Sequence, residues 1–298
     1  MMNIIKPNKL KKGDTIAIIA PAGNVEKDKI LNSVRYFENS GYKIKLGKNI
    51  FNQDRYLAGT DEERLNDLHE AFADNEVRAI FCARGGYGSI RLINRIDYEL
   101  IRNNPKIFCG YSDITALSLM LLKKAGLITY SAPMPKGDFQ PEDIDKFTAD
   151  NFWNALTNNS LTITTQNLKT YKDGDAKGIL WGGNLATICS LCGLDFIPDE
   201  KFIFFAEDLN EPVYKLDRSL RQLMNINKFR QNVTAVILGD FLGVEKYNDQ
   251  LDKLFNELAQ ELNVPVYGGY QITHAKTKVT VPVGANCQLE NKNLHINY

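Results

Sequence analysis

Apolar and polar residues alternate with two different periods along the first 130 residues. Four short apolar runs predict β-strands. The segments between them repeat apolar residues every three or four positions, as a helix facing a core does. The predicted strands lie within residues 15–23, 43–49, 77–84 and 106–111, and the predicted helices within 26–41, 61–75, 98–104 and 113–126. This alternation predicts a parallel sheet with helices on both faces, whose ligands bind at the carboxyl ends of the strands.

The pattern changes after about residue 140. Residues 141–175 contain one helical stretch and then a polar, turn-rich stretch, so we interpret them as a linker. Residues 176–298 carry shorter mixed elements and end in a β-rich tail. The sequence therefore predicts an α/β protein with an N-terminal domain over residues 1–140, which carries the candidate nucleophile, and a C-terminal domain over residues 176–298.

Composition and charge exclude two broad classes of protein. Lys plus Arg and Asp plus Glu number 36 each, so the formal net charge is zero, whereas a general nucleic-acid binder carries a basic face. The apolar run Ile16–Ala20 is too short for a signal peptide, and no run reaches the ~18 apolar residues of a membrane helix. We therefore expect a cytoplasmic protein that binds neither nucleic acid nor membrane.

The cysteines and histidines do not suggest a metal or redox site. Cys189 and Cys192 lie inside a helical pattern, whereas a redox CxxC motif needs its first thiol at a helix N-terminus. Buried structural thiols are the favoured interpretation. Because no second Cys or His pair completes a zinc site, we expect neither a metal nor a cofactor.

Glycines follow the third predicted strand, in the segment Arg84-Gly85-Gly86-Tyr87-Gly88. They free the backbone to adopt positive φ and to approach a ligand closely, and their N–H groups could form an anion-binding nest. The spacing matches neither a Walker loop nor GxGxxG. Taken alone, the segment is equally compatible with a plain turn.

Ser112 stands on the corner between the fourth predicted strand and the helix after it. Gly110 supplies the small residue that a strained nucleophile turn needs two positions before the serine. Ile114 occupies the position two residues after it, so the G-x-S-x-G motif of the α/β-hydrolases is absent. On this local evidence alone, a helix cap formed by Ser112 or Asp113 is the favoured interpretation.

An acid and a histidine in the second half complete a possible triad with Ser112. An apolar run ends at Glu207 and Asp208, and Glu211 follows closely, so the choice of acid remains open. His274 lies in a glycine-bearing loop before a strand. A serine nucleophile needs an imidazole base oriented by a carboxylate, so these residues make acyl transfer a coherent hypothesis.

The chain resembles the LD-carboxypeptidase family of serine peptidases, which comprises muramoyltetrapeptide carboxypeptidases and their microcin-immunity relatives. The resemblance covers nearly the whole chain. Its central block is long and specific. The segments that carry it are "GDTIAIIAPAG", "RGGYGSIRLINRIDYELIRNNPKIFCGYSDITAL", "GGNLATI", "EDLNEPVYKLDRSLRQL" and the terminal "H…VPVG".

This resemblance implies a flavodoxin-like N-terminal domain and a smaller, mixed α/β, β-rich C-terminal domain with a Ser-Glu-His triad between them. The family's serine, acid and histidine fall on Ser112, Glu207 and His274. The backbone amides of Gly86 and Asp113 would form the oxyanion hole. No metal takes part in this chemistry.

The resemblance also implies an activity. The expected enzyme is a serine carboxypeptidase that cleaves the L,D-peptide bond of murein tetrapeptide and releases the terminal D-Ala during peptidoglycan recycling, as a homodimer. An exopeptidase must hold the free carboxylate of its peptide substrate, for which a cation near the glycine loop is suited. The candidate substrate-binding residues are Arg84, Gly85, Tyr87 and Asn184.

Two other functions remain open from the sequence. The first is a microcin-immunity-type amidase that cleaves peptidyl nucleotides. The second is a non-catalytic ligand-binding protein with a vestigial triad. The sequence also leaves open whether the third residue of a murein substrate is diaminopimelate or lysine.

Overall fold

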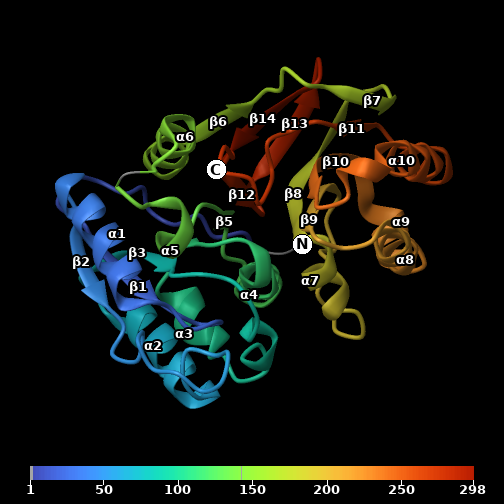
Figure 1. The fold of residues 1–298 in the computed structure, drawn as a ribbon. Helices are drawn as coiled ribbons and strands as arrows, with labels where there is room; N and C mark the ends of the chain where they lie inside the picture. The colour runs from blue at the N-terminus through green and yellow to red at the C-terminus, as the bar shows by residue number, and fades with distance from the viewer. Residues whose placement is uncertain (1–2, 142) are drawn as a thin grey trace.

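The computed structural model describes residues 3–141 and 143–298 and contains two β-sheets surrounded by helices (Figure 1). The first sheet has the strand order β12-β5-β4-β3-β1-β2. Strands β1 to β5 are parallel and have the flavodoxin order 2-1-3-4-5, as predicted. The strands are β1 (Thr15–Ile19), β2 (Lys43–Leu46), β3 (Val77–Cys82), β4 (Ile107–Cys109), β5 (Thr129–Ser131) and β12 (Val281–Val283).

Helices connect these parallel strands, and their ends follow local sequence signals. Thr60 caps α2 in a capping box, because its hydroxyl accepts from the Glu63 amide while the Glu63 carboxylate accepts from the Thr60 amide. Gly126 ends α4 in the left-handed conformation with φ of 75°. The helices of this part are α1 (Lys27–Asn39), α2 (Asp61–Ala73), α3 (Tyr98–Asn103), α4 (Thr115–Ala125) and α5 (Pro135–Asp138), with short 3₁₀ turns η1 (Ser89–Arg91) and η2 (Ser112–Ile114).

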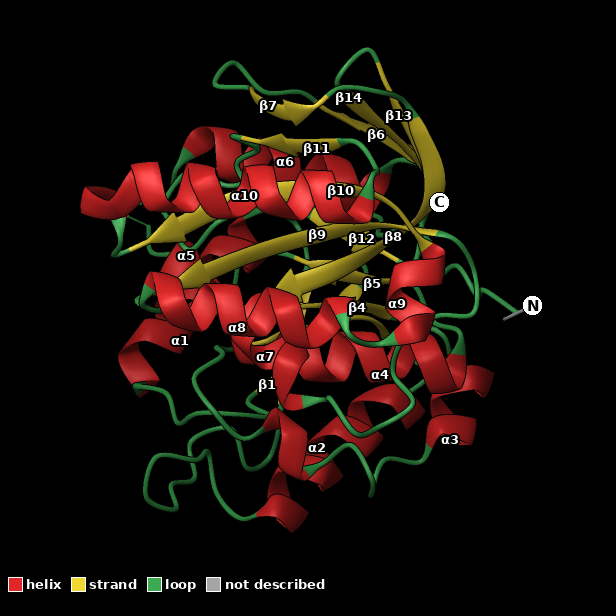
Figure 2. Ribbon diagram, turned by 90° about the vertical axis from the view of Figure 1, so that its right-hand side faces the viewer, coloured by secondary structure: helices red, strands yellow, loops and turns green. Residues whose placement is uncertain are grey.

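The second sheet is mixed and has the order β6-β14-β13-β8-β9-β10-β11-β7. Strands β8 to β11 are parallel, while the other pairs are antiparallel, which confirms the predicted mixed, β-rich second part. Helices α8 and α10 lie over β9 and β10 (Figure 2). The strands are β6 (Ser160–Ile163), β7 (Lys169–Lys172), β8 (Ala176–Asn184), β9 (Phe202–Leu209), β10 (Val233–Leu242), β11 (Val266–Gly268), β13 (Asn286–Glu290) and β14 (Asn293–Asn297), and the helices α6 (Lys146–Thr157), α7 (Leu185–Ser190), α8 (Val213–Met224), α9 (Asn227–Asn232) and α10 (Asn248–Leu262), with η3 (Glu245–Tyr247).

The segment predicted as a linker, residues 141–175, holds α6 and the two strands at the edges of the second sheet, β6 and β7. The chain also returns from the second sheet to the first. Strand β12 pairs antiparallel with β5, at the edge of the first sheet. The two sheets are therefore connected by three passages of the chain.

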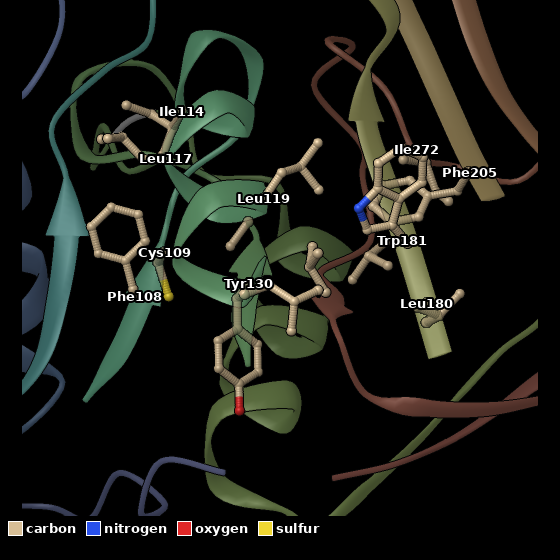
Figure 3. Packing of buried hydrophobic residues seen from close by; sticks show 14 of the residues in the cluster. Phe108, Cys109, Ile114, Leu117, Leu119, Tyr130, Leu180, Trp181, Phe205 and Ile272 are labelled. Carbon is tan, nitrogen blue, oxygen red and sulfur yellow. The ribbon is translucent and has the colours of Figure 1, made fainter. Parts of the chain in front are cut away.

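Helix α4 lies between the two sheets and joins their cores. It packs against β5 of the first sheet and β8 of the second, and almost all of its residues are buried. An all-round apolar helix of this kind needs neighbours on every side. Figure 3 shows Leu119 of α4 between Phe108 of β4 and Trp181 of β8. None of the helices in the described residues is both long enough and apolar enough to span a membrane.

Candidate active site

Ser112 occupies a strained corner directly after β4. Its φ is +61°, a left-handed value that is uncommon for residues other than glycine. Gly110 makes the tight approach possible, because a Cβ there would lie 2.8 Å from Cγ2 of Ile114 and 3.1 Å from Cβ of Cys82. Strained backbone of this kind clusters at functional sites. The geometry is that of a strand-to-helix corner that presents a side chain at the edge of the sheet.

The glycine loop lies against Ser112 because β3 and β4 are neighbours whose carboxyl ends meet at one edge of the sheet. A Cβ on Gly85 would lie 2.9 Å from Cβ of Ser112 and 3.2 Å from both its Oγ and the amide nitrogen of Asp113. The Asp113 carboxylate accepts a hydrogen bond of 2.9 Å from the Ser89 amide, which anchors the far end of the loop. Gly86 has φ of +96°, a conformation that favours glycine.

His274 and Glu207 form a direct contact on the facing side. The distance from Nδ1 of His274 to Oε2 of Glu207 is 2.5 Å. Glu207 is 3% exposed, and this burial raises the pKa of its carboxyl group. The contact with His274 acts in the opposite direction and lowers that pKa. Glu207, the acid that the family resemblance selects, is therefore the one that contacts the histidine.

Tyr111 links the histidine to the serine. Its ring packs edge-on against the ring of His274, with centroids 5.0 Å apart, and its peptide bond leads into Ser112. Among residues 3–141 and 143–298, no hydrogen bond joins Ser112 to His274. Catalytic hydrogen bonds of this kind are often long before substrate binds.

Asn184, a predicted substrate contact, caps α7. Its side-chain oxygen accepts from the Thr187 amide at 3.0 Å, and its amide group donates to Asp208 at 2.9 Å. Its backbone amide donates to the Thr115 hydroxyl at the start of α4. These bonds join the second sheet to the helix that follows Ser112, and they occupy Asp208, which leaves Glu207 as the acid that faces His274.

Arg84 and Tyr87, also predicted to contact the substrate, flank Gly85 and Gly86 in the glycine loop. Nη1 of Arg84 donates to the Asn24 carbonyl oxygen at 3.0 Å, so the guanidinium joins this loop to the loop after β1. Tyr87 is 45% exposed and packs edge-on against Tyr56. The structure thus places both residues beside the loop that touches Ser112.

Sequence reasoning missed a buried cluster behind the histidine. Nζ of Lys278 lies 2.5 Å from Oδ1 of Asp138 and 3.3 Å from the hydroxyl of Tyr111. Tyr111 directly precedes Ser112 in the segment Gly110-Tyr111-Ser112-Asp113, and this position is a signal that could have identified Tyr111 as part of the site. Lys278 and Asp138 carry no such signal, because lysine and aspartate side chains are usually exposed.

Neither this cluster nor the rest of the described residues offers a group of side chains suited to a metal ion. In the part of the chain that the structure describes, no three His, Cys, Asp or Glu side chains come together in a way that could hold an ion. The groups that the site brings together are a serine, an imidazole, a carboxylate and backbone amides.

Comparisons with known proteins match both halves of the chain to one family. Residues 16–132 match the model of the LD-carboxypeptidase N-terminal domain, and residues 177–289 match that of the C-terminal domain. The chain is 36% identical to a probable murein peptide carboxypeptidase of Bacillus subtilis, over 95% of this chain and 91% of the relative. It is 31% identical to the murein tetrapeptide carboxypeptidase of Pseudomonas aeruginosa, over 94% of each chain.

Solved structures with the same fold belong to two kinds of protein. The crystal structure of muramoyltetrapeptide carboxypeptidase from Oxalobacter formigenes has a TM-score of 0.86 and 30% identity, covering 95% of this chain and 99% of the other. The crystal structure of an MccF-like protein from Bacillus anthracis has a TM-score of 0.90 and 28% identity, covering 98% of both chains. Both halves of the chain and the named relatives lead to one conclusion: the chain belongs to the LD-carboxypeptidase family.

Proposed function

We propose that the protein is a serine carboxypeptidase that hydrolyses the L,D-peptide bond of murein tetrapeptide and releases the terminal D-Ala. The observation that carries the proposal is the 2.5 Å contact between His274 and Glu207, facing a serine whose φ is +61°. The names of the Bacillus subtilis and Pseudomonas aeruginosa relatives support this substrate class.

The proposed chemistry assigns one task to each side chain. Ser112 attacks the carbonyl carbon of the L-residue, and Nε2 of His274 takes the serine proton and returns it to the leaving amine. Glu207 holds the Nδ1 side of the ring, which fixes the tautomer and stabilises the imidazolium. The acyl-enzyme on Ser112 is then hydrolysed by water, activated by the same imidazole.

The oxyanion would be stabilised by backbone amides. The amide of Asp113 follows the nucleophile directly, and Gly86 belongs to the loop that touches it. One donor of this kind is typically worth roughly 3–4 kcal/mol of transition-state stabilisation. These are the two amides that the sequence predicts for this role.

A second candidate function follows from one observation. The similarity to the MccF-like protein extends over 98% of both chains, so an amidase that cleaves peptidyl nucleotides is the alternative. The relatives with the higher sequence identity, 36% and 31%, carry murein peptide names, and this favours the carboxypeptidase.

Two measurements test the proposal. Mass spectrometry of a muropeptide mixture should show loss of D-Ala from tetrapeptides on incubation with the protein. A fluorophosphonate probe should label the wild type but not Ser112→Ala, while Ser190→Ala, a surface serine on α7, serves as the labelled control. Labelling or full turnover in Ser112→Ala would refute the serine mechanism. Cleavage of a peptidyl nucleotide in preference to the tetrapeptide would support the second candidate.

A further inference from the structure

Lys278 is a buried cation close to the proposed triad. It lies between His274 and β12, is 3% exposed, and pairs with Asp138 of α5 at 2.5 Å. A buried ion pair contributes little to stability on balance, because removing both charges from water costs about as much as their attraction gains. The location of this pair therefore suggests a role other than stability.

The pair is connected to the histidine through one aromatic ring. Nζ of Lys278 lies 4.7 Å from the centroid of the Tyr111 ring and 3.3 Å from its hydroxyl, which also hydrogen-bonds to Asp138. The same ring packs against that of His274 at 5.0 Å. The cation and the imidazole thus lie within about 10 Å of each other and contact the same ring, the cation through cation–π attraction.

A small, partly open space lies between this cluster and Glu207, the acid of the proposed triad. Its volume is about 10 Å³, which is close to the space that one water needs. The polar residues around it include Tyr111, Glu207, Thr273 and Lys278. Charges that face such a space act on one another through little water, so their mutual effect is larger than at a surface.

We propose that Lys278 and Asp138 are positioning residues for His274: their ion pair holds Tyr111 against the imidazole and, because the two charges balance, adds no net charge beside it. This inference rests on the proposed function, since it assigns His274 the role of general base. The pair is made by the segment before β12 and by α5, so it forms only when the two halves of the chain are assembled.

Other charged groups lie near this histidine or near Lys278. On β9 they are Glu207, which contacts the ring, and Asp208, which is bonded to Asn184. From β10, Asp240 bonds to Thr273, the residue before the histidine. Around Lys278 itself, the charged groups of neighbouring segments are Asp138, Asp145, whose carboxylate accepts from Thr148 and Thr277, and Lys276, which pairs with Asp143.

The charges predict opposite effects for the two single substitutions. Lys278→Met leaves the Asp138 carboxylate uncompensated, which favours the imidazolium, so the acidic limb of kcat/KM should move to higher pH. Asp138→Asn leaves the ammonium uncompensated, so the limb should move to lower pH. At about 10 Å and an effective dielectric constant of ~20, each shift should be about one pH unit.

The experiment is the pH profile of tetrapeptide hydrolysis for wild type, both single variants and the double variant Lys278→Met/Asp138→Asn. The double variant should return the limb to the wild-type position, with a reduced kcat and an unchanged KM, because the ring loses its support but not its net charge. It also keeps the test possible if one single variant fails to fold. Lys276→Met, which removes an exposed cation from the same loop, should not move the limb.

Shifts of the two single variants in the same direction, or a double variant displaced from the wild-type limb, would overturn the proposed role. Unshifted limbs in both single variants would also overturn it. Failure of the proposed function itself has a different signature, because the wild type would then release no D-Ala at any pH.

Discussion

The imidazole of His274 and the carboxylate of Glu207 meet at 2.5 Å, although 67 positions separate them in the chain. Their meeting follows from the order of the parallel strands. Strand β10 lies between β9, which carries Glu207, and β11, after which the chain must turn back toward β9. The Asp240 amide donates to the Ile272 carbonyl oxygen at 3.0 Å, so the returning loop crosses the end of β10 and delivers the histidine to the acid.

Glu207→Gln should lower kcat by about 10⁴-fold, since an amide in place of the carboxylate stabilises the wrong tautomer of His274. The matched control is Glu211→Gln. Glu211 is only four residues away, but its side chain is 28% exposed and pairs with Lys215 at 3.3 Å. This control should keep kcat within a few-fold. Steady-state kinetics on the tetrapeptide decides the matter, and a larger loss in Glu211→Gln would transfer the role to that residue.

Gly85→Ala should impair catalysis more than folding. The added Cβ would lie 2.9 Å from Cβ of Ser112, so either the loop or the serine must move, and a misplacement of about 1 Å can cost about a hundredfold in rate. Gly137→Ala adds the same atom where no other atom lies within 4 Å. Kinetics and thermal melting of both variants check this, and a fully active Gly85→Ala enzyme would show that the loop does not constrain Ser112.

Lys106 should make stability depend on pH in the alkaline range. It is 6% exposed, its ammonium donates to the carbonyl oxygens of Ala71 and Asp74, and burial lowers its pKa to about 8 from the ordinary 10.5. Between these values the unfolded chain binds the proton and the folded chain does not. The free energy of unfolding therefore rises with pH across this window, by up to about 3 kcal/mol.

Lys106→Met lacks this contribution. Urea unfolding of both proteins between pH 7 and 10.5 gives their free energies of unfolding. The free energy of the wild type should increase relative to that of Lys106→Met as pH rises. A constant difference across the window would show that the ammonium is not destabilised by burial.

The stereochemistry of the substrate provides another prediction. An exopeptidase holds the terminal carboxylate of its substrate, and inversion of the leaving residue redirects that carboxylate, which should cost about a hundredfold in kcat/KM. The tetrapeptide ending in L,D-linked D-Ala should therefore be cleaved well. The pentapeptide ending in D-Ala-D-Ala and an all-L peptide should be poor substrates. Comparable kcat/KM values for the three peptides would contradict this selectivity.

Periodicity alone predicts much of the first sheet, because β1, β3 and β4 are buried apolar runs and the longer helices α1 and α2 each bury one face. The predicted strand within residues 77–84 is β3 (Val77–Cys82), and the predicted helix within 61–75 is α2 (Asp61–Ala73). Ser112 could be singled out because a small residue, Gly110, precedes a helix start. The contact between Glu207 and His274 depends on strand order, which local pattern does not contain. The residue types made both of them candidates, but the choice of Glu207 among the neighbouring acids came from the family resemblance.

Two features could not be predicted from the sequence. Strand β12 contains Pro282 and reads as a short apolar run, and nothing in that run indicates a partner in the first sheet rather than the second. A proline is tolerated there because β12 is an edge strand. The ion pair of Lys278 with Asp138 joins residues 140 positions apart, and burial of a charge appears only once the fold exists.

The pairing of β12 with β5 also has a consequence for biosynthesis. When the first five strands have left the ribosome, the outer edge of β5 still lacks its neighbour, and that neighbour is made only after strands β6 to β11 have been translated. The loop that carries His274 directly precedes β12, so docking of this last strand draws the histidine toward Ser112. Completion of the first sheet and placement of the proposed general base thus depend on the same late step of chain synthesis.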